Sequence, residues 1–107
     1  MYNQINHENI VKLLGVVTDK DYMSLALELV EGHTLHALID DKDLRVAYDL
    51  NLDFKNRISK NLADALHYLH WLRPSPIVHK DVKPHNFLIC RSSKIAKLCD
   101  FGVSKLV

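Results

Sequence analysis

The sequence is poor in cysteine and has no surplus of charge of either sign. Its 107 residues include two cysteines, and 14 Lys and Arg residues against 13 Asp and Glu residues leave a formal net charge of +1. Cys90 and Cys99 cannot form a disulfide framework, so we expect a protein of a reducing compartment. The balanced charge argues against a general binder of nucleic-acid polymers or membrane surfaces, which needs excess cations to neutralise phosphates.

Long apolar runs and targeting signals are also lacking. No run approaches the ~20 apolar residues that a bilayer span requires, so we expect no transmembrane segment in this chain. The first ten residues, MYNQINHENI, are polar and unlike a secretory signal peptide. A chain of this length forms one domain at most, and its 48% hydrophobic and 25% charged residues are ordinary for a globular protein.

Two apolar runs near the N-terminus predict a β-hairpin. Residues 8–17 and 22–30 are rich in β-branched and aliphatic side chains, and the polar turn TDKD separates them at 18–21. Such a pair is typical of a hairpin that is buried on at least one face. Gly32 then marks the exit from the second strand. The polar, mixed residues 40–53 predict a loop or a poorly formed helix, with a solvated acidic surface.

At Phe54 the period of the apolar residues becomes that of a helix. The residues that form the apolar stripe are Phe54, Ile58, Leu62, Leu66 and Leu69. Asp53 is the expected N-cap, and the prolines of RPSP (73–76) predict that the helix ends before them. Residues 86–90 and 95–99 flank the polar turn RSSK and predict a second hairpin.

Four polar residues near the second hairpin suit one chemistry. Asp81, Lys83 and Asn86 lie in the loop before it, and Asp100 follows it. Phosphoryl transfer needs a group that orients the attacking hydroxyl, a cation beside the phosphate oxygens, and oxygen ligands for Mg²⁺. A carboxylate, an ammonium, an amide and a second carboxylate can supply these needs. Each residue alone is common in loops, but the ordered combination is specific.

The ordered motifs resemble those of eukaryotic protein kinases. That family has a catalytic loop His-Arg-Asp-Leu-x-x-x-Asn and an Asp-Phe-Gly motif. Here the matching stretches are HKDVKPHN at 79–86 and DFG at 100–102. The resemblance covers nearly the whole chain and is closest to the tyrosine-kinase-like and receptor-like serine/threonine kinases. It implies an α+β, protein-kinase-like fold, with ATP and Mg²⁺ as cofactors. The implied reaction is transfer of the γ-phosphoryl group to Ser or Thr hydroxyls of a protein substrate.

The resemblance also implies a role for each matching residue. The implied catalytic residues are Asp81, Lys83, Asn86 and Asp100, of which Asn86 and Asp100 would bind Mg²⁺. A lysine at position 83 is typical of serine/threonine specificity in this family. The implied nucleotide-binding residues are Leu27 at the gatekeeper position, the backbone of Glu28 and Val30 beside adenine, Leu88 beneath it, and Cys99 lining the pocket.

The chain departs from the family in one residue and in extent. Lys80 stands where the family usually has Arg, which weakens the expectation of control by phosphorylation. Residues 1–31 resemble the end of the upper lobe and the hinge, and residues 32–107 resemble the lower lobe through Asp-Phe-Gly. The Gly-rich loop and the later helices of the family have no counterpart in the sequence. We therefore expect a partial domain that is inactive and marginally stable or unstable alone.

Other readings remain open. A pseudokinase or kinase-fold binding module would keep the fold without catalysis, although retention of all four catalytic groups favours an active parent protein. The pairs His33/His36 and His67/His70 could bind zinc if they converged, but the favoured interpretation is histidines that lie on the surface or have ordinary hydrogen-bond partners. We expect a cytoplasmic location, either as a free enzyme or as the cytoplasmic part of a membrane receptor, with a nucleotide and a protein substrate as partners.

Overall fold

The period-two alternation of residues 87–98 determines which face of the central sheet is buried. The computed structural model describes residues 5–99, 105 and 106. In it, β5 (Phe87–Cys90) pairs antiparallel with β3 (Gly32–Thr34) on one side and β6 (Ala96–Leu98) on the other. Successive side chains of a strand point to opposite faces. The buried residues are Phe87, Ile89, Ala96 and Leu98, and the half-buried ones between them are Leu88 and Lys97. One face therefore enters the core and the other stays accessible.

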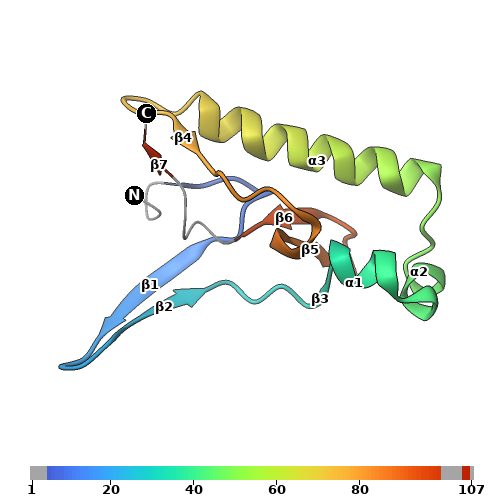
Figure 1. Cartoon of the computed structure of the whole chain (residues 1–107), viewed down its shortest axis with the longest axis horizontal. Helices are drawn as coiled ribbons and strands as arrows, with labels where there is room; N and C mark the ends of the chain where they lie inside the picture. Colours follow the sequence, from blue (N-terminus) through green and yellow to red (C-terminus); the bar gives the residue numbers. More distant parts are fainter. Residues whose placement is uncertain (1–4, 100–104, 107) are drawn as a thin grey trace.

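Helix α3 (Leu52–His70) covers the buried face of this sheet, as Figure 1 shows. The helix ends before RPSP, as predicted, but the predicted N-cap is wrong. Asn51, not Asp53, caps the helix: its Oδ1 accepts the N–H of Phe54 at 2.8 Å. Asp53 lies one residue inside the first turn, where its negative charge faces the positive end of the helix dipole. No helix of the described residues is both long and apolar enough to cross a membrane.

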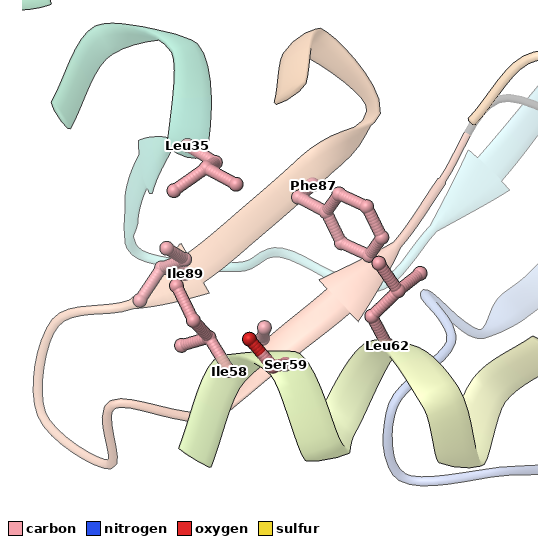
Figure 2. Close-up of a pocket in the computed structure, with 7 residues that line it drawn as sticks. Leu35, Ile58, Ser59, Leu62, Phe87 and Ile89 are labelled. Carbon is pink, nitrogen blue, oxygen red and sulfur yellow. The ribbon is translucent and has the colours of Figure 1, made fainter. Parts of the chain in front are cut away.

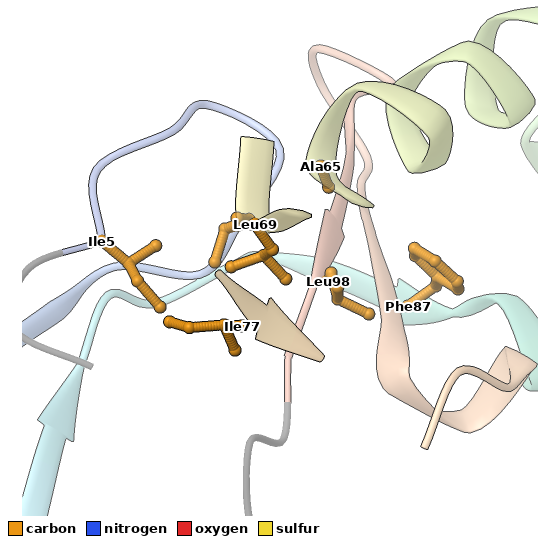
Figure 3. Close-up of a cluster of buried hydrophobic side chains, with 7 residues drawn as sticks. Ile5, Ala65, Leu69, Ile77, Phe87 and Leu98 are labelled. Atoms are coloured by element: carbon orange, nitrogen blue, oxygen red, sulfur yellow. The ribbon is translucent and has the colours of Figure 1, made fainter. Parts of the chain in front are cut away.

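The main core joins the C-terminal half of α3 to the strands and to the N-terminal segment. Figure 3 shows Ala65 and Leu69 of α3 together with Ile5, with Ile77 of β4 (Ile77–Val78), and with Phe87 and Leu98 of the sheet. Strand β4 also pairs with β7 (Lys105–Leu106). Burial of each large apolar side chain contributes roughly 1.5–3 kcal/mol. The predicted apolar stripe of the helix therefore faces the core, as expected.

A second apolar cluster holds the two short helices that follow β3. These are α1 (Leu35–Asp40) and α2 (Lys42–Ala47), and α2 lies within residues 40–53, where a loop or a poorly formed helix was predicted. Asp41 caps α2 by accepting the N–H of Asp43 at 2.9 Å, so one of the solvated acidic residues has a structural role. Figure 2 shows side chains from α1, α3 and β5 around an apolar cavity of about 80 Å³, among them Leu35, Ile58 and Phe87.

Gly32 allows β3 to approach β5 closely. A Cβ atom at this position would lie 1.8 Å from the carbonyl oxygen of Ile89, so any side chain would separate the two strands. The structure therefore corrects the prediction that Gly32 leaves a strand, because it begins one. Thr34 ends β3, and its hydroxyl then caps α1 by accepting the N–H of Ala37 at 3.1 Å.

The N-terminal hairpin forms where predicted, with β1 at Leu13–Thr18 and β2 at Met23–Leu27. The expectation that one of its faces is buried is wrong. All five residues of β2 are exposed, and Leu14, Val16 and Val17 of β1 are at least half exposed. In Figure 1 the hairpin projects away from the central sheet and α3. Its strands are held to each other by the backbone ladder rather than by a shared core.

Candidate active site

The backbone at His79, Lys80 and Asp81 is held in a tight kink. Lys80 has a φ of 72°, in the left-handed region that non-glycine residues rarely adopt. His79 is 1% exposed, and its Nδ1 accepts the N–H of Asp81 at 3.1 Å. Because Nδ1 is an acceptor, the ring proton of a neutral imidazole lies on Nε2, which donates to the carbonyl of Cys99 at 2.9 Å. The buried imidazole thus fixes the loop to the end of β6.

Asp81, Lys83 and Asn86 come together within this loop. Asn86 lies in the 3₁₀ turn η2 (Pro84–Asn86), and its Nδ2 donates to the carbonyl of Asp81 at 2.7 Å and to Asp81 Oδ2 at 3.1 Å. The Nζ of Lys83 lies 3.6 Å from Asp81 Oδ1. Asn86 is buried, whereas Asp81 is partly accessible and Lys83 half exposed. One carboxylate, one ammonium and one amide therefore share a small, solvent-reachable site.

The end of β6 is bound to the same turn. The backbone N–H of Cys99 donates to the carbonyl of Asn86 at 2.9 Å, and Cys99 Sγ lies 3.4 Å from the same oxygen. The two cysteines are free thiols, as expected, although both are half-buried. Asp100, the fourth predicted catalytic residue, lies outside the described residues, as does the rest of the Asp-Phe-Gly motif.

The predicted nucleotide-binding residues lie on two parts of the chain. Leu88 is on the accessible face of the central sheet, where its cross-strand neighbours are Thr34 and Lys97. Leu27 ends β2, pairs with Leu13 and is 43% exposed. Glu28 and Val30 follow it in the segment predicted as the hinge, which we define as residues 28–31. The backbone N–H of Glu28 already donates to the carbonyl of Lys12 at 2.9 Å.

Lys97 lies beside the candidate site, and the sequence reasoning missed it. Its Nζ lies 3.0 Å from Oε1 and 3.1 Å from Oε2 of Glu28, which joins the hinge to the sheet face that carries Leu88. Burial alone would raise the pKa of Glu28, but hydrogen bonds from the Lys12 N–H and the Lys97 ammonium outweigh it and lower that pKa below 4.5. The alternation of 95–99 was the available signal, since it puts Lys97 opposite the buried face.

The donor groups of the site fit Mg²⁺ better than zinc. The amide nitrogen of Asn86 faces Asp81, which leaves its Oδ1 as the atom for a cation, and Mg²⁺ prefers such hard oxygen ligands. In the described part of the chain no three His, Cys, Asp or Glu side chains gather as a metal-binding group. The histidines of the zinc hypothesis have other contacts: His33 Nδ1 lies 3.0 Å from the Tyr48 hydroxyl, and His36 pairs with Asp40 at 3.1 Å.

Comparison with known proteins identifies the family. The family described as "Protein kinase domain" matches residues 1–107. Similar proteins include mitogen-activated protein kinase kinase kinase 7 of Drosophila melanogaster, 34% identical over 94% of this chain and 14% of its own length. Wall-associated receptor kinase-like 10 of Arabidopsis thaliana is 39% identical over 98% of this chain and 13% of its own length. Seven transmembrane domain-containing tyrosine-protein kinase 1 of Dictyostelium discoideum is 33% identical over 94% of this chain and 14% of its own length.

These relatives agree with the predicted likeness to tyrosine-kinase-like and receptor-like kinases. The chain spans about one seventh of the length of the relatives named here. The family match extends over every residue, including the loop that holds Asp81, Lys83 and Asn86. The chain belongs to the protein kinase domain family.

Proposed function

We propose that this chain is part of an ATP-dependent protein kinase that transfers the γ-phosphoryl group of ATP to Ser or Thr hydroxyls. The proposal rests on one observation: the side chains of Lys83 and Asn86 lie beside the accessible carboxylate of Asp81. Catalysis of phosphoryl transfer depends mainly on positioning and on charge stabilisation. The loop suits both needs, because hydrogen bonds hold Asp81 and Asn86 before any substrate arrives and the Lys83 ammonium lies beside the same carboxylate.

Each residue of the loop has a proposed task. Asp81 orients the substrate hydroxyl and accepts its proton, and Lys83 neutralises the transferred phosphoryl oxygens. Asn86 Oδ1, with Asp100, holds Mg²⁺, which when bound supplies positive charge to the phosphate oxygens. Asn86 also keeps Asp81 oriented through its amide nitrogen.

A nucleotide site beside the hinge completes the proposal. The backbone of Glu28 and Val30 contacts adenine, Leu27 and Cys99 line the pocket, and Leu88 forms its floor. Residues 1–31 contribute the end of an upper lobe, and residues 32–107 the start of a lower lobe. The proposed location is cytoplasmic, with a protein substrate as partner. The serine/threonine preference rests on Lys83, and the name of the Dictyostelium relative makes tyrosine the competing acceptor.

A phosphoryl-transfer assay tests the proposal in the native protein that carries this chain. Radiolabelled ATP is offered with Ser/Thr peptides and with Tyr peptides, and Asp81→Asn is compared with the unaltered protein. Loss of the group that accepts the proton should reduce the rate by about 10²–10⁴-fold. The matched control is Asp21→Asn, which removes an exposed carboxylate in the β1–β2 turn and should leave the rate unchanged.

The possible results of the assay distinguish a Ser/Thr kinase from a Tyr kinase and from a pseudokinase. Transfer to Ser/Thr peptides that depends on Asp81 supports the proposal, and transfer to Tyr peptides alone refutes the acceptor preference. Binding of Mg-ATP without transfer to any peptide would favour a pseudokinase or binding module.

A further inference from the structure

The ion pair between Glu28 and Lys97 is the most protected one in the described residues. Its two side chains are 27% and 20% exposed, respectively, whereas those of Lys60 and Asp64 on α3 are 75% and 43% exposed. Both carboxylate oxygens of Glu28 lie within hydrogen-bond distance of the Lys97 ammonium. Partial desolvation strengthens such a pair, and it makes removal of one partner costly because the other keeps an uncompensated charge.

The pair stands where three segments of the chain meet. Glu28 follows β2, and Lys97 lies in the middle of β6. The backbone of Lys12, just before β1, makes two hydrogen bonds with Glu28, one as donor and one as acceptor. The Lys12 N–H donates to Glu28 Oε1 at 2.9 Å, and the Glu28 N–H donates to the Lys12 carbonyl at 2.9 Å. We name this set, Lys12, Glu28 and Lys97, the hinge junction.

The hairpin has little else to fix its direction. Both strands are mostly exposed, so no apolar face packs it against the central sheet. Near its base, the backbone of Asn9, Val11 and Leu98 forms a short parallel contact, with bonds of 2.8 and 3.0 Å. Figure 1 shows the hairpin leaving the body of the molecule at this point. The far end of the hinge is held by the Arg91 N–H, which donates to the Glu31 carbonyl at 2.9 Å. At its near end, the side chains of Glu28 and Lys97 tie the hinge to β6.

We propose that Lys97 is a positioning residue: through Glu28 it holds the hinge in the orientation that binds adenine. The inference rests on the proposed nucleotide site, since Glu28 and Val30 are its proposed backbone contacts. Lys97 need not touch the nucleotide for this role. A hinge that is already ordered loses less conformational freedom when a ligand binds, so an intact junction raises affinity by preorganisation.

The test uses the native protein that carries this chain and two readouts. The first is amide hydrogen exchange of the hairpin and hinge, which needs no nucleotide. The second is the Kd of Mg-ATP by calorimetry. Lys97→Met removes the ammonium and keeps the apolar part of the side chain at nearly the same length. We expect exchange of residues 13–30 to rise about tenfold and Mg-ATP binding to weaken by about tenfold, while exchange in α3 stays unchanged.

Three further variants and one control make the result specific. Glu28→Gln removes the charge but keeps an oxygen for the Lys12 N–H, and it should match Lys97→Met. The double variant should lose no more than either single one, because both changes break the same tie. Lys97→Arg keeps the cation and should restore most of the affinity. Lys60→Met breaks an exposed ion pair on α3 and serves as the matched control.

The two readouts, hydrogen exchange and the Kd of Mg-ATP, can each contradict a different part of the proposal. Unchanged exchange in Lys97→Met, or additive effects in the double variant, overturns the junction itself. Faster exchange with an unchanged or tighter Kd overturns the link to nucleotide binding. If the unaltered protein binds no Mg-ATP, the proposed function fails and the link fails with it, while hydrogen exchange still decides whether Lys97 orders the hinge.

Discussion

At the scale of single residues, Asp81 is closely constrained by its neighbours in the loop. Its N–H donates to His79, its carbonyl and Oδ2 accept from Asn86, and its Oδ1 faces Lys83. Four atoms of one residue are therefore held by partners within eight residues of sequence. Such a carboxylate needs little reorganisation to receive a hydroxyl group, which is the condition for catalysis by preorganised charge.

Cys90 offers a separate test at this scale. Hydrogen bonds from Ser92 and then Ser93 lower the pKa of its thiol from 9.0 to about 7. Since the thiolate is the reactive form, alkylation of Cys90 by iodoacetamide should be half-maximal near pH 7 and should increase above it. Replacement Ser92→Ala removes the largest cause and should move the midpoint upward, toward 9.0.

The control for this titration is Ser24→Ala, an exposed serine of β2 that should leave the midpoint in place. Mass spectrometry of the alkylated peptide measures Cys90 and Cys99 separately. A Cys90 midpoint near 9 in the unaltered protein would contradict the described contacts with Ser92 and Ser93.

At the scale of elements, the start of α3 can be tested by two neighbouring substitutions. Asn51→Ala removes the oxygen that accepts the Phe54 N–H, and should lower the free energy of unfolding by about 1 kcal/mol. Asp53→Ala removes only a favourable first-turn charge and should lower it by about 0.3–0.5 kcal/mol. Urea denaturation measures both. A larger effect from Asp53 than from Asn51 would restore the original assignment of the cap.

Elements marked by an apolar stripe or by apolar runs around a polar turn were predictable from the sequence, and unmarked elements were not. The 3.6-residue stripe predicted α3, and the two apolar runs on either side of RSSK predicted the hairpin of β5 and β6. Strand β3 and helix α1 were missed because no apolar run of their own marks them, and their positions depend on contacts far along the chain. The close approach of Gly32 to Ile89 is one such contact.

The candidate site was likewise predictable only in part from the sequence. The loop motif predicted Asp81, Lys83 and Asn86 as site residues, and the structure brings these three side chains together within six residues of sequence. The alternation of 95–99 puts Lys97 on the accessible face of the sheet, but it does not identify the partner Glu28, which lies 69 positions away. The prediction that one face of the hairpin is buried failed for a related reason. Apolar strands indicate that another segment covers them, but the sequence of the strands does not identify that segment.

At the scale of the whole molecule, the hairpin is the surface most prone to association. Val16 and Leu25 are cross-strand neighbours and are 50% and 54% exposed, and exposed apolar strands with open edges favour self-association. We expect the 107-residue chain to associate as its concentration rises. Leu25→Lys should reduce that association at least several-fold in sedimentation velocity experiments.

The comparison variant is Val46→Lys. Val46 is 74% exposed on α2, away from the hairpin, so its replacement should leave association unchanged. Equal effects of the two variants, or a chain that stays monomeric at every concentration, would show that the hairpin is not the associating surface.

The central claim is that the molecule binds a magnesium-bound nucleotide. The most direct test of this claim is the dependence of ATP affinity on the concentration of Mg²⁺. Calorimetry on the native protein that carries this chain should show ATP binding that tightens as Mg²⁺ is added. That tightening should disappear in Asn86→Ala and in Asp100→Ala, while exchange of the α3 amides confirms that both variants remain folded. The same Mg²⁺ dependence in the variants as in the unaltered protein would contradict the account.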